Sequence, residues 1–244
     1  MSNLLSNKKV VIIGASSGIG LAVATMAAKQ NVSIIMSSRT QDKLERAANS
    51  IEGDTKAIAV NILDENSVNA LFERVGNFDH LVITAVADEN SLRSPLVDMD
   101  TTTARRGMEK FWGTFFAVRA AAKNIAKDGS ITITSSVSIF KPSKNGGVSV
   151  MSAASGAVAV FGKTLAAELA PIRVNVIAPG VVDTGVWSSQ SDSERDELVN
   201  WAERSLPVQH IGQPEELAQA ILGLITNSYI TGVVLPVDGG LTVI

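Results

Sequence analysis

Short apolar runs alternate with longer mixed segments along the whole chain. The runs are rich in β-branched residues, which is typical of strands buried on both faces of a sheet. They cover residues 10–13, 32–36, 56–60, 80–84, 130–135 and 173–177, and a last run begins at Ile230 and leads into a turn at 238–240. The pattern therefore predicts about seven strands.

The segments between these runs have the periodicity of helices. We expect helices from residue 21 to about 30, at 41–51 and 65–75, from about 102 to 126, from 151 to about 170, and from 214 onward. Strands that alternate with helices predict a parallel sheet with helices on both faces. A length of 244 residues suits one such α/β unit, so we expect a single domain over 1–244 with a doubly wound sheet.

Two irregular regions are predicted to surround an active site. Residues 136–150 form a long connection after a strand and contain Lys141 and Lys144. Open α/β sheets place their sites at this end of the strands. Residues 186–206 contain Trp187 and Trp201 and are interpreted as a substrate lid, although Trp201 could instead be a packing anchor.

The predicted helix from Met151 has small residues on nearly every face. A helix without a polar stripe favours burial all round. One face can pack on the sheet, so we expect the other to contact a second subunit in a homodimer or homotetramer. The alternative is a monomer whose own loops cover this helix.

Composition narrows the functional classes. The net charge of −3 gives no reason to expect a nucleic-acid partner. The chain has no cysteine and two histidines, so thiolate metal sites and disulfides are excluded and no metal is expected. No uninterrupted apolar run is long enough to predict a membrane span, and we expect a cytoplasmic protein.

The chemistry begins at Gly14-Ala-Ser-Ser-Gly18-Ile-Gly20, between the first strand and the first helix. Glycines allow a sharp turn and close approach of the backbone to a pyrophosphate, and the helix N-terminus binds the anion. Glycine also serves any tight turn, so this stretch alone is an ambiguous signal. The next strand ends in Ser37-Ser38-Arg39-Thr40, with no acid for the 2′-hydroxyl of NAD. An arginine flanked by hydroxyls instead suits the 2′-phosphate of NADP, unless Arg39 is only a solvated helix residue.

With these features the chain resembles the short-chain dehydrogenase/reductase family over nearly its full length. The matching motifs are the glycine turn, Asn61 after the third strand, Ser135-Ser136 after the fifth, Pro179-Gly180 with Thr184 after the sixth, and the terminal 237–240. The resemblance implies a Rossmann-like sheet of seven strands, an NAD(P) cofactor, and a dimer or tetramer formed partly through the two long helices. It also implies that Asn61 and Ile62 border the adenine and that 179–184 hold the nicotinamide carboxamide. We expect NADP(H) in preference to NAD(H), contacted by Gly14, Ser16, Ser17, Gly18, Ile19, Gly20, Ser38, Arg39, Thr40, Asn61, Ile62, Ala85, Pro179, Gly180, Val182 and Thr184.

The catalytic motif departs from the family pattern. Carbonyl-reducing members use a serine, a tyrosine, a lysine four residues later and an asparagine, because hydride addition creates an alkoxide that needs a proton. Ser136 matches the serine, but Met151 stands for the tyrosine, Ser155 for the lysine and Lys110 for the asparagine. Residues 83–86 are Ile-Thr-Ala-Val, where the family usually has Asn-Asn-Ala-Gly. The one tyrosine, Tyr229, lies outside any such motif.

Two functions remain open on this sequence. The first is an NADP(H)-dependent oxidoreductase of a small carbonyl or alcohol with a different proton donor, for which Lys110 is the leading residue; Lys110 could also simply extend to the surface. Lys141 and Lys144 are weaker donors, His80 is interpreted as structural, and His210 as a capping or surface residue with a substrate role left open. The second is a catalytically silent NADP(H)-binding sensor or structural oligomer partner.

Overall fold

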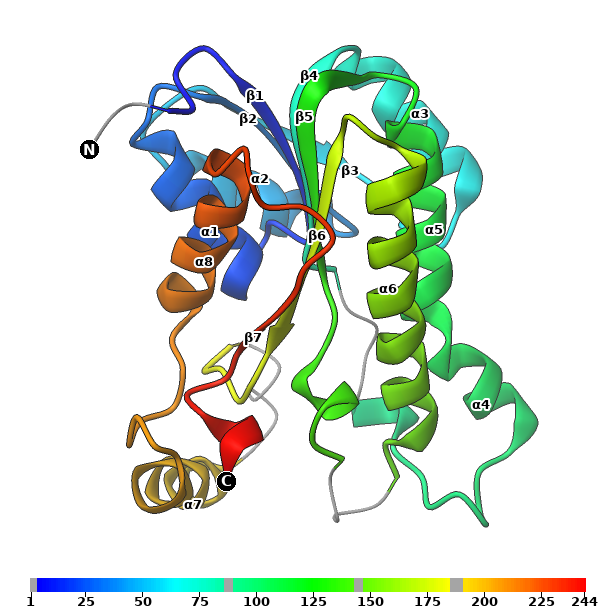
Figure 1. Cartoon of the computed structure of the whole chain (residues 1–244), viewed down its shortest axis with the longest axis vertical. Coiled ribbons are helices and arrows are strands. Elements are labelled where there is room, and N and C mark those ends of the chain that lie inside the picture. Colours follow the sequence, from blue (N-terminus) through cyan, green and yellow to red (C-terminus); the bar gives the residue numbers. More distant parts are fainter. Residues whose placement is uncertain (1–3, 86–89, 143–146, 185–190) are drawn as a thin grey trace.

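Seven parallel strands form one twisted sheet at the centre of the molecule (Figure 1). The computed structural model describes residues 4–85, 90–142, 147–184 and 191–244. The strand order is β3-β2-β1-β4-β5-β6-β7. The strands are β1 (Lys9–Ile13), β2 (Ser33–Ser38), β3 (Thr55–Ala59), β4 (Phe78–Ile83), β5 (Ile125–Thr134), β6 (Arg173–Pro179) and β7 (Val234–Val237). This is the seven-stranded, doubly wound Rossmann-like sheet that the sequence predicted.

Helices cover both faces of the sheet (Figure 1). One apolar cluster joins alternate strand residues such as Val10 and Ile12 to one helical layer, and a second joins Val11 and Ile13 to the opposite layer. Strand residues alternate between the two clusters because side chains along a strand point to opposite faces. The first layer contains α1 (Gly18–Ala28), α2 (Gln41–Asn49) and α8 (Pro214–Thr226), and the second contains α3 (Glu65–Val75), α5 (Glu109–Ala121) and α6 (Ser149–Glu168).

The prediction of a single helix from about residue 102 to residue 126 is wrong. The chain forms α4 (Thr101–Gly107) and then α5, with Met108 between them, and α5 ends at Ala121 before a longer β5. Asp100 caps α4 by accepting hydrogen bonds from the Thr102 and Thr103 N–H groups at 2.8 and 3.0 Å. At the end of α4, Gly107 packs against Val150, where a Cβ would lie 2.7 Å from Val150 Cγ1. Because Gly107 has no side chain, the chain can approach α6 closely at this break.

The predicted lid lies partly outside the described residues. Trp187 and the rest of 186–190 are not described, whereas the remainder forms α7 (Asp192–Ser205), with Ser191 and Glu194 in a capping box. Trp201 is 38% exposed on α7, beside a small apolar cluster of Ala202, Leu206 and Ile211. Three short 3₁₀ helices complete the described elements: η1 (Asn90–Leu92), η2 (Val137–Ile139) and η4 (Leu241–Val243). The lid remains a prediction.

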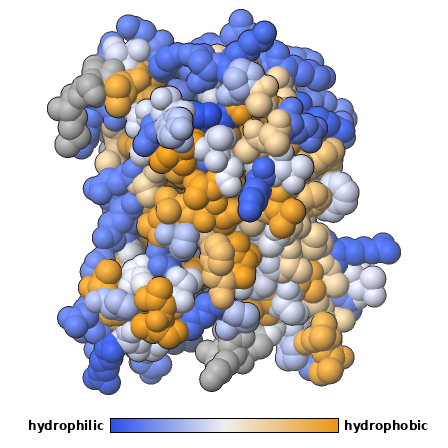
Figure 2. Space-filling view, viewed as in Figure 1, coloured by the Kyte–Doolittle hydropathy of each residue, from blue (hydrophilic) through white to orange (hydrophobic). Residues whose placement is uncertain are grey.

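Helix α6 is long and apolar enough to cross a membrane by length and composition alone. It packs beside α5 and against β6, as the core helix of a Rossmann-like layer does. Its outer side is not covered by described residues: Val160 is 68% exposed. Figure 2 shows apolar side chains gathered at the middle of the face that carries β7 and α6, with polar residues around the rim.

Candidate active site

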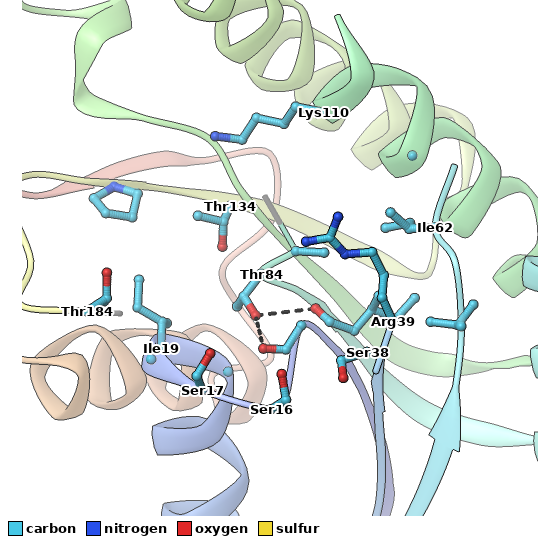
Figure 3. A pocket seen from close by; sticks show the side chains of 18 of the residues that line it. Ser16, Ser17, Ile19, Ser38, Arg39, Ile62, Thr84, Lys110, Thr134 and Thr184 are labelled. Carbon is cyan, nitrogen blue, oxygen red and sulfur yellow. Dashed lines mark hydrogen bonds between the residues drawn. The ribbon is translucent and has the colours of Figure 1, made fainter. Parts of the chain in front are cut away.

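A cavity of about 380 Å³ lies at the carboxyl ends of the strands. The order of strands reverses direction at β1, which has β2 on one side and β4 on the other, and such a switch point leaves a crevice for ligands. The cavity collects the predicted cofactor residues except Asn61, together with both predicted reaction residues, Ser136 and Lys110 (Figure 3). Residues that were far apart in the sequence thus share one site.

The glycine turn forms the floor of this cavity. Gly14 and Gly18 have φ of +100° and +55°, values that favour glycine. A Cβ on Gly14 would lie 2.6 Å from the Ala85 nitrogen, and one on Gly20 would lie 2.5 Å from Thr84 Oγ1. The cap residue of α1, Ser17, makes no side-chain cap hydrogen bond, so its hydroxyl does not occupy the first-turn N–H groups. These features fit a pyrophosphate at the start of α1.

Thr84 holds the turn in place. Its Oγ1 lies 3.3 Å from both the Ile13 and the Gly14 carbonyl oxygens (Figure 3). Thr84 lies in the segment 83–86, which differs from the usual Asn-Asn-Ala-Gly of the family. Its role could not be assigned from the sequence because the contacts join residues 71 and 70 positions apart.

The predicted adenosine end contains one residue that sequence reasoning missed. Arg39 is exposed and lines the cavity beside Ser38 and Thr40, as expected. Lys43 lines it as well, and its Nζ lies 3.4 Å from Ser17 Oγ. The signal in the sequence that could have identified Lys43 is its position one helical turn after Arg39. Asn61, in contrast, is absent from the lining, and its Oδ1 accepts a hydrogen bond from the Leu63 N–H at 3.2 Å.

The predicted nicotinamide end is built by the segment after β6. Pro179, Gly180, Val182 and Thr184 all line the cavity. A Cβ on Gly180 would lie 2.6 Å from the Cα of Asp238, so the terminal motif closely supports this segment. Asp238 in turn accepts hydrogen bonds from the Gly240 and Thr242 N–H groups at 3.0 and 2.8 Å.

The reaction end gathers hydroxyls and one ammonium. Lys110 is partly buried, and its Nζ donates a 2.9 Å hydrogen bond to the Ser135 carbonyl oxygen, on the side of the cavity opposite Ser16 and Ser17 (Figure 3). Ser136 lines the same end, and its Oγ accepts a hydrogen bond from the Ser138 N–H at 3.2 Å. Thr134 Oγ1 is buried and has no hydrogen-bond partner within the part of the chain that the structure describes.

Comparisons with known proteins decide the family. The family model described as enoyl-(acyl carrier protein) reductase matches residues 14–242. The chain belongs to the short-chain dehydrogenase/reductase family. It is 32% identical to carbonyl reductase family member 4 of Xenopus laevis, over 96% of this chain and 98% of that protein. It is 31% identical to the 3-oxoacyl-[acyl-carrier-protein] reductase of Homo sapiens, over 98% and 99% of the two chains.

A solved structure supports the same assignment. The crystal structure of a small-chain dehydrogenase in complex with NADPH superposes with a TM-score of 0.83. The two chains are 31% identical, and the match covers 98% of this chain and 100% of the other.

Two positions of the short-chain dehydrogenase/reductase motif lie outside the described cavity lining. Met151 is half-buried in the first turn of α6, and Ser155 is 3% exposed. The Ser155 carbonyl oxygen accepts a 2.8 Å hydrogen bond from Ser135 Oγ, which ties α6 to the end of β5. The titratable side chains that do line the described cavity are Arg39, Lys43, Glu109 and Lys110.

The lining of this short-chain dehydrogenase/reductase site does not include His80, His210 or Lys141. His80 is 6% exposed in β4, as expected of a structural residue, and His210 Nε2 lies 3.7 Å from Glu216 Oε1. Lys141 Nζ donates a 2.5 Å hydrogen bond to the Ile244 oxygen. Lys144 lies outside the described residues. Among the residues that are described, no group of three or more His, Asp or Glu side chains is placed to hold a metal ion.

Proposed function

We propose that the protein is an NADP(H)-dependent oxidoreductase that interconverts a small carbonyl compound and its alcohol. The observation that carries this proposal is the continuous cavity from the glycine turn to Ser136 and Lys110. NADP(H), when bound, supplies or accepts the hydride. The preference for NADP(H) is supported by Arg39 at the end of β2, where an acid would suit NAD. The 31% identical relative in complex with NADPH also supports it.

The proposed division of labour follows the chemistry of carbonyl reduction. The oxygen of the substrate gains negative charge as hydride is added, so hydrogen-bond donors must already face it. Ser136 supplies a hydroxyl at this end of the cavity, and the Lys110 ammonium donates a hydrogen bond to the neighbouring Ser135 carbonyl. We assign to Lys110 the protonation of the product oxygen that Met151 is unable to perform, because a thioether carries no proton.

A lysine at this place must work without the usual tyrosine–lysine pair. General acid catalysis typically contributes ~10² to 10⁴ in rate. The replacement of Lys110 by methionine should therefore lower kcat at least about 100-fold, while the dissociation constant for NADPH changes less than about twofold. Ser136→Ala should also lower kcat, and Lys123→Met, at an exposed lysine just after α5, should change neither value.

The second function, a silent NADP(H)-binding protein, is favoured by the absence of Met151 and Ser155 from the described lining. The test is fluorescence titration with NADPH and NADH followed by turnover measurements on a panel of aldehydes and ketones. Turnover that depends on Lys110 and Ser136 supports the oxidoreductase. Tight NADPH binding without turnover across the panel would overturn it in favour of the silent protein.

We also propose that the protein is a homodimer or homotetramer assembled through α5 and α6. Trp112 on α5 is 49% exposed and Val160 on α6 is 68% exposed. The ring of Phe161 lies 5.6 and 6.1 Å from the rings of Phe111 and Phe115, so the two helices share an aromatic seam. Exposed apolar residues beside a packed seam favour burial against a second copy.

A further inference from the structure

Lys43 lines the cavity and has no role in the function proposed above. It lies in the first turn of α2, lines the cavity, and reaches toward the glycine turn, where its Nζ is 3.4 Å from Ser17 Oγ. Arg39 lines the same part of the cavity from the end of β2. The mouth of the cavity is thus bordered by two cations from one short stretch of chain.

These two cations have no carboxylate partner within the described residues. The acids of α2, Asp42 and Glu45, are one and two positions from Lys43 and so do not face it on the helix. Glu45 instead accepts a 2.6 Å hydrogen bond from Gln41 Nε2. Two like charges at the edge of one cavity repel each other, and a doubly charged anion between them would remove that repulsion. The chain as a whole has a net charge of −3, so this positive pair is a local feature and not a general excess of basic residues.

The surrounding groups match one kind of anion. Ser16, Ser17 and Thr40 line the same cavity as the two cations, and Thr40, the cap residue of α2, makes no side-chain cap hydrogen bond. A phosphate monoester carries close to two negative charges at neutral pH and several acceptor oxygens, which suits hydroxyls and cations together. A lone hydroxyl of an NAD ribose would satisfy neither cation.

We propose that Lys43 is a second cationic ligand of the 2′-phosphate of NADP(H) and a determinant of its selection over NAD(H). The inference rests on the proposed function, because it concerns the cofactor of that activity. Arg39 supplies a planar, forked group and Lys43 a compact charge, and the contact of Lys43 with Ser17 holds that charge beside the pyrophosphate turn. Lys43 is therefore a binding and specificity residue and takes no part in proton transfer.

The test measures binding alone. Lys43→Met keeps most of the length of the side chain and removes its charge. We expect the dissociation constant for NADPH to rise about tenfold and that for NADH to change less than about twofold, because a charged hydrogen bond is lost only to the phosphate. Adenosine 2′-monophosphate should weaken similarly, and adenosine 5′-monophosphate should not. Arg46→Met, at an exposed position in the last turn of α2, is the matched control and should leave all four constants unchanged.

Each outcome bears on a different claim. Equal losses for NADPH and NADH, or no loss for either, would overturn the role of Lys43 while the oxidoreductase proposal stands on the turnover of the wild-type protein. A wild-type protein that binds NADH more tightly than NADPH would instead contradict the cofactor assignment itself. The melting temperature of Lys43→Met should match that of the control, so that a folding defect is recognised directly.

Discussion

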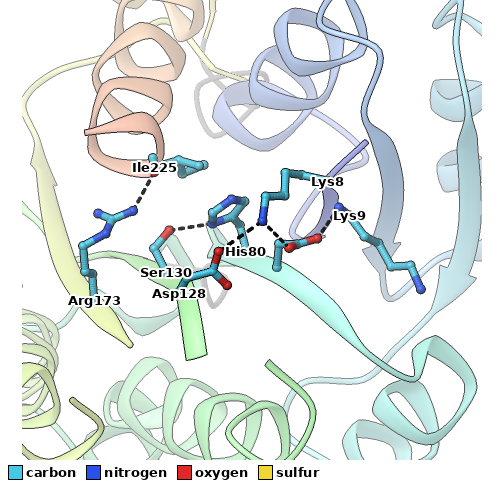
Figure 4. Close-up of polar contacts among 8 residues, drawn as sticks. Lys8, Lys9, His80, Asp128, Ser130, Arg173 and Ile225 are labelled. Atoms are coloured by element: carbon cyan, nitrogen blue, oxygen red, sulfur yellow. Dashed lines mark hydrogen bonds and ion pairs between the residues drawn. The ribbon is translucent and has the colours of Figure 1, made fainter. Parts of the chain in front are cut away.

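His80 shows how one buried residue links pH to the stability of the whole protein. Its Nδ1 lies 3.0 Å from Ser130 Oγ, and the contact joins the paired strands β4 and β5 (Figure 4). The pKa of His80 is lowered from 6.5 to about 4, chiefly because the imidazole is buried. The charges of Arg173 and Lys8 contribute to this lowering, and those of Asp79 and Asp128 oppose it. The imidazole is therefore neutral in the folded protein at neutral pH.

This neutral state makes the protein sensitive to mild acid. Between pH 6.5 and about 4 the unfolded chain binds a proton at His80 and the folded chain does not, so the free energy of unfolding falls as the pH falls. The loss should approach roughly 3 kcal/mol at pH 4 relative to pH 7. His80→Gln should flatten this dependence in urea unfolding measurements, whereas His210→Gln, at the other and exposed histidine, should preserve it. A slope that follows His210 would contradict the assignment.

Single residues were predictable where a motif fixed their place along the chain. Arg39 and Thr184 were found because strand ends and the glycine turn set their positions, and both line the cavity. Lys43 was missed because a lysine in an amphipathic helix is indistinguishable by pattern from a solvated one. The place of Lys110 in the cavity could be suggested but not decided, since its partner, the Ser135 carbonyl, lies 25 residues away.

At the scale of elements, the join between β1 and α1 tolerates no side chain at Gly20. A Cβ there would overlap the Gly14 carbonyl oxygen and lie 2.5 Å from Thr84 Oγ1, two groups that fix the turn. Gly20→Ala should cost about 1–3 kcal/mol of stability by overpacking and weaken NADPH binding at least about tenfold. Thermal unfolding and fluorescence titration measure these two effects.

The matched control for this element is Gly223→Ala. A Cβ at Gly223, on the exposed side of α8, meets no atom within 4 Å. Alanine in a helix interior is favoured over glycine by roughly 0.5–1 kcal/mol, so this variant should be slightly more stable and bind NADPH normally. Equal behaviour of the two variants would show that the turn at Gly20 is not the constraint that the structure indicates.

The elements themselves were predicted unevenly. Strands and helices of the first half follow the apolar periodicity closely, and α3 (Glu65–Val75) agrees with the helix predicted from residue 65 to about 75. The break at Met108 was missed because the helical pattern continues through it, and the cause is a distant contact of Gly107 with Val150. Local patterns thus predict an element, but a tertiary contact decides where it ends.

The whole fold was predictable because every layer repeats the same signal. Buried parallel strands need apolar side chains on both faces, and the connecting helices need one apolar side each, so the alternation alone predicts the doubly wound sheet. What it does not predict is how several copies of the fold meet, because an exposed apolar side chain looks like a core residue in the sequence. Only the structure separates Val160, 68% exposed, from Val158, which is fully buried in the same helix.

The proposed assembly follows from that difference and can be tested directly. If α5 and α6 form the interface, the double change Trp112→Lys and Val160→Glu places charges at its centre and should raise the dissociation constant at least about 100-fold. Light scattering coupled to size exclusion should then show a smaller species than the wild-type dimer or tetramer, with an unchanged circular dichroism spectrum. Val97→Glu, at a side chain 91% exposed on the connection before α4, is the matched control and should keep the wild-type mass. A wild-type protein that is monomeric at high concentration would contradict the interface, because the apolar surface of α6 would then remain in water at no cost to the fold.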